Sequence, residues 1–402
     1  MAHQIALGES MPTDPLLLLE QLTAFPHRGA ASKSNAKAAE IIVNELKKAE
    51  FSVDFQSFRT PPTYLPVIYW LIGGLITGLL TIQWLGWASV ILVALFAING
   101  LLYFDWRPSI FLFLPPLVQA KNIIGRHSLP TAKRKLILMA HYDSAPVSSL
   151  YSRQSKDGFR NSIRASMVLM ALAVPIVGLS YHLPQNNYLL VIRILLSMYF
   201  VGQAILGTAV FWQKGYTNGA SDNATGVVAA LKTAEHLKTQ LKNTEIEIVL
   251  TNAEEVGMVG AYYYWKSLQR QSQLTDGSLY LINFDTLGSG QLKVITQTGS
   301  MTLIEYDNIV TQSAINIIQN NRHFGQVSTG SWHTADFDSA WFVRAGIPCV
   351  TLSALDENGL MPHIHRPEDT LDHVDTQPML LAIDLAKAVA LALDKKSYTL
   401  SK

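Results

Sequence analysis

The sequence predicts a three-layer α/β/α fold into which two transmembrane helical hairpins are inserted. The first observation is composition: 15% of the 402 residues are charged and 49% are hydrophobic, whereas roughly 25% charged residues is typical of soluble domains. The second is distribution, because the charge is missing from a few long stretches only. The third is alternation: outside these stretches short apolar runs alternate with amphipathic segments, a pattern that predicts a sheet covered by helices on both faces.

Composition also excludes several classes of protein. A chain this apolar and this poor in charge is not intrinsically disordered. The net charge is +1, so there is no basic surplus and we expect no nucleic-acid partner. Cys349 is the single cysteine of the sequence, which excludes an internal disulfide and any zinc site that needs two cysteines.

The first hairpin lies between Arg59 and Asp105, an interval without Asp, Glu, Lys or Arg. We expect spans over Leu65–Ile82 and Trp87–Phe104, each close to the ~20 apolar residues that cross a bilayer, with a tight turn at Gln83–Gly86. The alternative is a pair of buried core helices, but core helices rarely run this long without a polar face.

The second hairpin has spans over Ala165–Leu183 and Tyr188–Trp212. Pro175 is expected to kink the first of these. Arg193 is the one formal charge in the pair, and it can either snorkel to the interface or face a neighbouring helix.

The spans divide the chain into hairpins 65–104 and 165–212 and a polar domain of residues 1–64, 105–164 and 213–402. The turns at the far ends of the hairpins carry no Lys or Arg, whereas the opposite side carries Arg107, Arg153, Lys156, Arg160, Arg164 and Lys214. The positive-inside rule therefore predicts that the polar domain and both termini are cytoplasmic.

The polar domain is predicted to alternate strands and helices. Expected helices are Pro15–Thr23 with Asp14 as its cap, Ser34–Lys48, Ala224–Leu237, a segment ending near Leu268, Met301–Gln319 and Gln377–Leu393. Expected strands are Phe51–Phe58, Lys121–Arg126 paired with it, Lys135–Ala140, Glu245–Thr251, Ser278–Phe284, Leu292–Thr296 and Cys349–Leu352.

Five short motifs lie at or near the ends of these strands or in the neighbouring loops. They are HYDS at His141, GASDNATG around Asp222, AEEVG at Glu254–Glu255, NFDTLG at Asp285 and HIHRPEDT at His363–His365. Ligand sites of α/β sheets lie at the carboxyl ends of strands. A mixture of imidazole and carboxylate suits Zn²⁺ or a similar divalent ion.

Five donors are more than one catalytic zinc needs, but two ions that share one carboxylate would use them all. Glu254 and Glu255 are neighbours at a strand end and point in different directions. One of them can bind metal while the other stays free as a general base. Each motif alone is more typical of a surface turn. The prediction of a metal site depends on all five motifs occurring together, in this order and near strand ends.

At these motifs the sequence resembles the co-catalytic zinc aminopeptidases, a family that includes bacterial leucyl aminopeptidases, glutamate carboxypeptidase and glutaminyl cyclase. The resemblance runs from about Lys121 to the C-terminus, outside the second hairpin. It implies a zinc-peptidase domain with a mixed sheet and two Zn²⁺ ions.

The resemblance also implies a role for each motif residue. Glu254 would be the general base and Asp143 a carboxylate behind the first histidine. One metal would be held by Asp222, Glu255 and His365, and the other by His141, Asp222 and Asp285, with Asp222 shared. His365 rather than His363 is the expected ligand because it directly precedes the Arg366–Thr370 stretch RPEDT.

The stretch FDSAWFVRAGIP resembles a Ser-Asp-His-containing segment of the family. Asp338 matches its aspartate, but Ser339 stands where histidine is usual. Trp332, His333, Asp336 and Asp338 are candidates to line the substrate pocket, the alternative being an ordinary surface loop.

The hairpins are the main departure from the soluble family members. Trp212 ends the fourth span and Asp222 follows ten residues later, so this ligand lies at most roughly 35 Å from the bilayer edge. The site is therefore expected near the membrane surface, where the hairpins either favour membrane-associated peptides or only anchor the enzyme.

The functional expectation is a membrane-anchored zinc aminopeptidase that hydrolyses N-terminal peptide bonds with a metal-activated water and Glu254 as base. The first rival is a glutaminyl cyclase-like acyltransferase with one zinc. A non-catalytic receptor-like homologue is a second, disfavoured by the complete ligand set. A transporter is a third, disfavoured by the single charge within the spans.

Overall fold

The computed structural model describes residues 13–130, 132–148, 158–271 and 278–395. Within these residues one mixed sheet has the strand order β1-β2-β4-β3-β5-β9-β6-β7, with β8 paired to β6. The strands are β1 Ser52–Thr60, β2 Val118–His127, β3 Arg134–His141, β4 Thr244–Thr251, β5 Leu279–Phe284, β6 Gln291–Thr298, β7 Ile304–Glu305, β8 Ser328–Trp332 and β9 Cys349–Leu355. The predicted pairing of the first two strands is confirmed, and the structure shows that it is antiparallel.

The centre of the sheet is parallel, with β4, β3, β5 and β9 side by side. Alternate side chains of β3 point to opposite faces: Leu136 and Leu138 belong to one apolar core and Ile137 and Met139 to another. Because these four strands run in the same direction, their carboxyl ends meet at one edge of the sheet. The candidate site lies along this edge.

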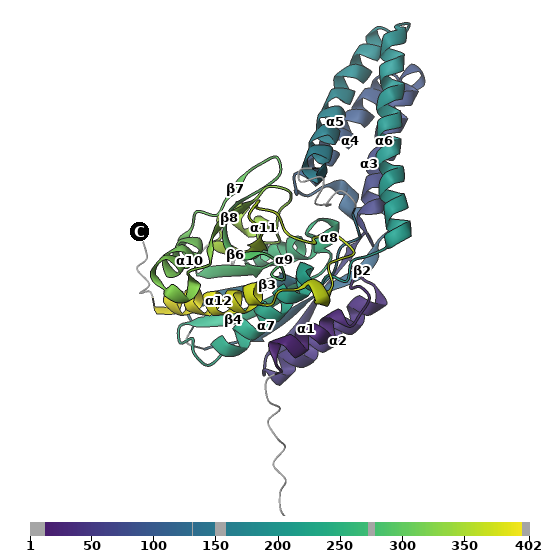
Figure 1. The fold of residues 1–402 in the computed structure, drawn as a ribbon. Coiled ribbons are helices and arrows are strands. Elements are labelled where there is room, and N and C mark those ends of the chain that lie inside the picture. The colour runs from purple at the N-terminus through teal and green to yellow at the C-terminus, as the bar shows by residue number, and fades with distance from the viewer. Residues whose placement is uncertain (1–12, 131, 149–157, 272–277, 396–402) are drawn as a thin grey trace, which may run out of the picture.

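Helices cover both faces of the sheet, so the three-layer arrangement is confirmed (Figure 1). One face is covered by α1 Pro15–Thr23, α2 Lys33–Lys48, α7 Thr225–Leu237, α10 Ile309–Asn320 and α12 Gln377–Lys395, and the other by α9 Val259–Arg270 and α11 Ala340–Arg344. Asp14 caps α1 by accepting a hydrogen bond from the backbone N–H of Leu16, and Pro15 fits the first helical position because it needs no backbone donor there.

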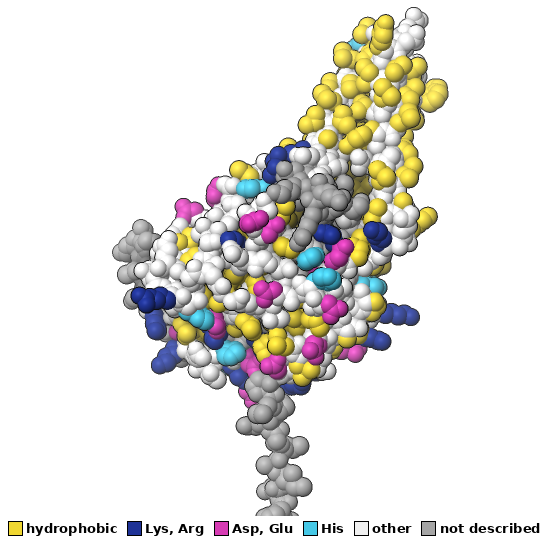
Figure 2. Space-filling model, viewed as in Figure 1, with side chains coloured by type: hydrophobic (Ala, Val, Ile, Leu, Met, Phe, Trp, Pro, Cys, Tyr) yellow, Lys and Arg dark blue, Asp and Glu magenta, His cyan; other side chains and the backbone are white. Residues whose placement is uncertain are grey.

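Four further helices form a bundle that projects from the α/β domain (Figure 1). They are α3 Tyr64–Leu85, α4 Trp87–Phe104, α5 Gly158–His182 and α6 Asn187–Lys214, all long and apolar enough to cross a membrane by length and composition. On the face drawn in Figure 2, the bundle carries mostly hydrophobic side chains, whereas charged side chains lie on the α/β domain and at the junction.

The bundle packs onto the α/β domain through one apolar cluster. Val67 and Leu71 of α3 share this cluster with Phe58 of β1 and with Val256 and Val259. Within the bundle, α3 lies close to α4 at Gly78, where an added Cβ would stand 2.4 Å from the Val93 side chain. Small residues allow helices to approach this closely.

The helices of the bundle match the predicted spans with small shifts. The turn after α3 is shorter than predicted, because the helix runs to Leu85 and Gly86 alone, with φ of 55°, reverses the chain. Arg193 is buried and its guanidinium donates a hydrogen bond of 2.8 Å to the Leu79 carbonyl of α3. It therefore faces a neighbouring helix rather than the interface.

One predicted helix, Met301–Gln319, is wrong over its first part. Residues 304–305 pair with β6 as β7, and the helix begins at Ile309. The Asn308 side chain accepts hydrogen bonds from the backbone N–H groups of Val310 and Thr311, and such a cap fixes where a helix starts.

Candidate metal centre

The predicted ligands from three loops meet at the carboxyl edge of the sheet. His141 is the last residue of β3, and Asp285 follows β5 directly. The Nε2 atom of His141 lies 3.2 Å from Asp222 Oδ1 and 3.8 Å from Asp285 Oδ2. These three donors come from positions far apart in the sequence, and the sheet brings them together.

A second group forms around His365. Its Nε2 atom lies 3.3 Å from Asp222 Oδ2 and 3.0 Å from Glu255 Oε2. Asp222 thus turns one carboxylate oxygen to each histidine. This is the arrangement in which one carboxylate would bridge two ions.

The two histidines of the HIH motif lie in different surroundings. The ring of His363 lies against that of His373, with 5.3 Å between their centroids. His365 instead points to Asp222 and Glu255. Both residues have φ in the left-handed region, 65° for His363 and 53° for His365, which costs a non-glycine residue about 1 kcal/mol and is common at functional sites.

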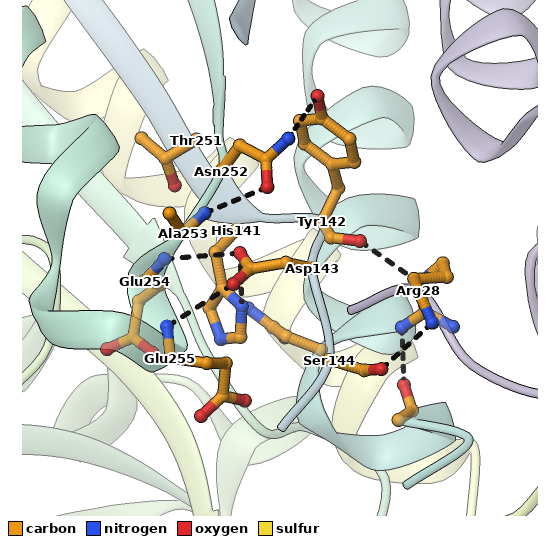
Figure 3. Close-up of polar contacts among 12 residues, drawn as sticks. Arg28, His141, Tyr142, Asp143, Ser144, Thr251, Asn252, Ala253, Glu254 and Glu255 are labelled. Atoms are coloured by element: carbon orange, nitrogen blue, oxygen red, sulfur yellow. Dashed lines mark hydrogen bonds and ion pairs between the residues drawn. The ribbon is translucent and has the colours of Figure 1, made fainter. Parts of the chain in front are cut away.

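Asp143 holds the glutamate pair in place (Figure 3). Its Oδ1 accepts a hydrogen bond of 3.2 Å from the Glu254 backbone N–H, and its Oδ2 accepts one of 3.3 Å from that of Glu255. Asp143 Oδ1 also lies 3.6 Å from Nδ1 of His141. One buried carboxylate therefore orients residues of both groups.

The GASDNATG loop is shaped by close packing against β5. The Asn223 amide donates to the Phe284 carbonyl at 2.9 Å and its oxygen accepts from the Gly226 and Thr286 backbone N–H groups. A Cβ at Gly226 would stand 2.1 Å from the Asn223 side chain and 2.6 Å from the Phe284 carbonyl. Only glycine fits at this contact, which fixes Asp222 relative to Asp285.

The sequence analysis missed two residues that support the site. Arg28 is 1% exposed and donates to the backbone carbonyls of Tyr142 and Gly219 at 3.1 and 2.7 Å. Asp369 accepts from the backbone N–H of Ser221 at 2.6 Å and of Asp222 at 3.2 Å. Asp369 was visible as part of the RPEDT motif, whereas no local pattern distinguishes Arg28.

Burial and mutual repulsion raise the pKa values of most carboxyl groups at the site. Burial, reinforced by Asp222, raises the pKa of Asp369 to about 7. Burial also raises the pKa of Glu255 to about 7, against the opposing effect of His365. The pKa of Glu254 is raised well above its usual value by burial, with Glu255 adding to the effect and His141 opposing it. Cations placed among these groups would relieve this excess of buried negative charge.

The donor set fits zinc in three respects. Imidazole and carboxylate are its usual nitrogen and oxygen ligands, and two ligands at ~2.0–2.1 Å from a tetrahedral ion are about 3.3 Å apart. The separations of 3.0 to 3.8 Å around His141 and His365 bracket this value. In addition, Glu255 Oε1 is buried and has no hydrogen-bond partner among the described residues.

A cavity of about 370 Å³ opens on this centre. The five predicted ligands and Glu254 line it, as do two of the proposed pocket residues, Trp332 and Asp336. His333 and Asp338 are not among its lining residues. Asp338 lies behind the wall, where it accepts a hydrogen bond from the Thr251 hydroxyl.

Ser339, which stands where the resemblance leads one to expect histidine, is fully buried. Its hydroxyl lies 2.8 Å from that of Tyr306 and 2.7 Å from that of Thr351. The serine thus belongs to a hydrogen-bonded core beneath the site, and it makes no contact with the cavity.

The fold is that of zinc-dependent aminopeptidases and related enzymes. A zinc aminopeptidase from Bacillus subtilis, BSAP, superposes with a TM-score of 0.56 at 15% identity, over 98% of both chains. The glutaminyl cyclase of Bacteroides thetaiotaomicron gives a TM-score of 0.56 at 15% identity, over 95% of this chain and 97% of that one.

The sequence matches cover less of the chain than the structural matches, and they indicate the same class of enzyme. Residues 203–390 match the model of peptidase family M28. Aminopeptidase YwaD of Bacillus subtilis (strain 168) is 26% identical over 204 residues, which are 48% of this chain and 43% of that protein. The resemblance predicted from the motifs is therefore confirmed, and the match spans less than half of this relative's length.

Proposed function

We propose that the protein is a membrane-anchored, zinc-dependent aminopeptidase that hydrolyses N-terminal peptide bonds. The observation that carries the proposal is the position of Asp222 between two histidine-carboxylate groups, with His141 at 3.2 Å and His365 at 3.3 Å. His141, Asp222 and Asp285 would hold one ion, and Asp222, Glu255 and His365 the other. The resemblance to YwaD and BSAP supports this assignment.

Bound zinc ions would lower the pKa of a water molecule and polarise the scissile carbonyl. Glu254 lines the cavity and is not one of the proposed ligands. It would take a proton from the attacking water and deliver it to the nitrogen of the leaving amine. Its position beside the ligands is set by the hydrogen bond from its backbone N–H to Asp143.

Asp143 would act through the residues it orients. A proton on His141 Nδ1, the nitrogen that faces the Asp143 carboxylate at 3.6 Å, would leave Nε2 unprotonated and directed to the ion. Carboxylates placed behind a ligating histidine commonly fix its tautomer in this way.

Metal analysis combined with a peptide-cleavage assay tests the proposal. Two zinc ions per chain and release of free N-terminal residues are expected. One zinc per chain together with formation of pyroglutamate from N-terminal glutamine would instead identify a glutaminyl cyclase-like enzyme. Absence of both activities in a zinc-loaded protein would identify a non-catalytic homologue.

We further propose that the four helices cross the membrane with the α/β domain on the cytoplasmic side. The hydrophobic surface of the bundle supports this topology. So do the basic residues near the ends of the helices at the α/β domain, where Arg107 follows α4, Arg164 lies near the start of α5 and Lys214 ends α6. Arg153 and Lys156, which contribute to the same argument, lie outside the described residues. Labelling of a single cysteine introduced at Gln185 in a C349A background tests it: a membrane-impermeant maleimide should react from the external side only.

A further inference from the structure

The cavity at the candidate metal centre continues into the four-helix bundle. Asp222 and Glu254 line one end of it, and Leu75 of α3, Met170 of α5 and Phe200 of α6 line the other. A single cavity therefore joins the proposed reacting groups to the interior of the apolar bundle.

The dimensions of the bundle part suit one extended chain. Its lining residues run from Tyr64 to Leu75 on α3, from Ser162 to Met170 on α5 and from Phe200 to Val210 on α6. At a rise of 1.5 Å per residue these stretches correspond to depths of about 12 to 17 Å. The whole cavity, including its end at the metal centre, has a volume of about 370 Å³, less than an α-helix about 10 Å across and about 16 Å long would fill.

The chemistry of the wall changes along the cavity. Every charged residue that lines it, within the described residues, belongs to the α/β domain. The bundle part is mostly aliphatic and aromatic, and its polar members are Tyr64, Tyr103, Ser162, Ser166 and Gln203. The Ser166 hydroxyl already pairs with that of Tyr199 at 2.9 Å. Apolar cavities of this kind hold hydrocarbon better than water.

We infer that the bundle part of the cavity is a subsite for a single unbranched hydrocarbon chain attached to the amide being cleaved. The inference rests on the proposed hydrolytic function and names its substrate class: amino acid or peptide amides that carry one alkyl or acyl chain. A helical transmembrane peptide is too wide for this space, whereas an extended chain can enter the bundle while its amide stays beside Glu254.

The reaction is an ordinary hydrolysis with water as co-reactant. The oxygen of water bonds to the carbonyl carbon, the C–N bond breaks, and the nitrogen takes a proton, so the products are a carboxylic acid and an amine. The hydrocarbon chain can belong to either product, depending on which side of the amide carries it.

Chain-length series test the inference with the full-length zinc-loaded protein in nanodiscs. One series is leucine N-alkylamides from ethyl to tetradecyl, with the chain on the leaving amine, and the other is N-acyl leucines of the same lengths. We expect kcat/KM to rise by up to about fourfold per methylene in one series and to level off once the chain exceeds the depth of the cavity.

Gly207 offers a way to block the subsite without touching the proposed ligands. A Cβ there would lie 3.7 Å from the Tyr64 side chain, an ordinary contact, so a larger side chain enters the cavity. Gly207→Phe should lower kcat/KM for the decyl substrate about tenfold or more and leave that for the ethyl substrate within twofold. Because wild type and variant share the same nanodisc, partitioning of the substrate into lipid cancels in this comparison.

Gly202 is the matched control on the same helix. An added Cβ meets no atom within 4 Å, and the residue does not line the cavity. Gly202→Phe should therefore leave both substrates unchanged. Equal losses for the ethyl and decyl substrates in G207F, or equal effects of the two variants, would overturn the inference.

A binding readout separates the subsite from turnover. In a Glu254→Gln variant, a leucine decylamide with a terminal diazirine should label cavity residues such as Leu71, Met170 and Phe200, and excess leucine decylamide should suppress the labelling. Labelling confined to the lipid-facing residues Leu172 and Ile194, which are 48% and 42% exposed, would show that lipid alone receives the chain and would refute the inference.

The two proposals fail in different ways. If short peptides such as Leu-Gly-Gly are cleaved but chain length has no effect, the hydrocarbon subsite is refuted and the peptidase function stands. If neither short nor alkylated amides are cleaved and Glu254→Gln changes nothing, the hydrolytic function itself is refuted.

Discussion

The α/β domain and the four-helix bundle are held together mainly by different means. Around the candidate metal centre, buried charged groups are fixed by hydrogen bonds between residues far apart in sequence, such as Arg28 with Gly219 and Asp369 with Asp222. In the bundle, α3 and α4 are held by apolar packing around small residues such as Gly78. The hydrogen-bonded centre tolerates little displacement of its residues, whereas the apolar packing of the bundle leaves room for a flexible ligand.

The largest expected effect concerns the α/β domain alone. Glu254→Ala should lower turnover of every substrate about 10²- to 10⁴-fold, the usual contribution of a general base, and leave two zinc ions bound. Turnover and metal content measured on the same preparation check this. Full activity in the variant would show that another group accepts the proton.

Removal of single ligands distinguishes the shared carboxylate from the others. Asp222→Ala should lose both ions, because each group contains one of its oxygens, whereas His365→Ala should keep the ion held by His141 and Asp285. Metal counts by mass spectrometry after gel filtration provide the measurement. Equal metal loss in the two variants would contradict a bridging role for Asp222.

A substitution in the bundle should lower the stability of the protein and leave its metal content unchanged. Gly78→Val places a side chain where a Cβ already stands 2.4 Å from Val93, and overpacking of this kind costs about 1 to 3 kcal/mol. We expect weaker thermal stability in nanodiscs with unchanged zinc content. Gly73→Val, where a Cβ meets no atom within 4 Å, is the control, and an equal loss in both variants would exclude packing as the cause.

The most gradual effect is electrostatic and lies at the boundary of the two regions. Burial raises the pKa of Asp336 to about 6, although Arg344 and the Thr298 hydroxyl favour its charged form. Since the unfolded value is 3.8, the folded chain keeps a proton between these values that the unfolded chain has lost. Stability contributed by Asp336 therefore falls as pH rises from about 4 to 6, by at most about 1.4 kcal/mol per pH unit.

Asp336→Asn removes this titration. The unfolding free energy of the wild type minus that of the variant should fall in that window as pH rises. Denaturant titration at fixed zinc measures both values. Parallel pH profiles for the two proteins would show that the group does not titrate there.

The sequence predicted most of the sheet because its parallel strands are short apolar runs that end at polar motifs, as β3 does at His141. The helix start at Ile309 was misplaced because residues 301–305 are apolar enough to continue it, although Asn308 was available as a cap signal. The role of Arg28 at the site could not have been found, because the site carbonyls that it binds lie 114 and 191 residues away. The cavity was equally hidden, since it depends on how the hairpins pack against the domain.

The second hairpin lies in the sequence between His141 and Asp222, and this order has a consequence for how the protein is made. A ribosome completes all four apolar helices before it synthesises Asp222, Glu255, Asp285 or His365. If the helices insert as they emerge, the metal centre can be assembled only on a chain that is already in the bilayer. Inserted copies would then be at the membrane before the last proposed ligands are made, so the order of the chain would place their hydrolysis at that surface.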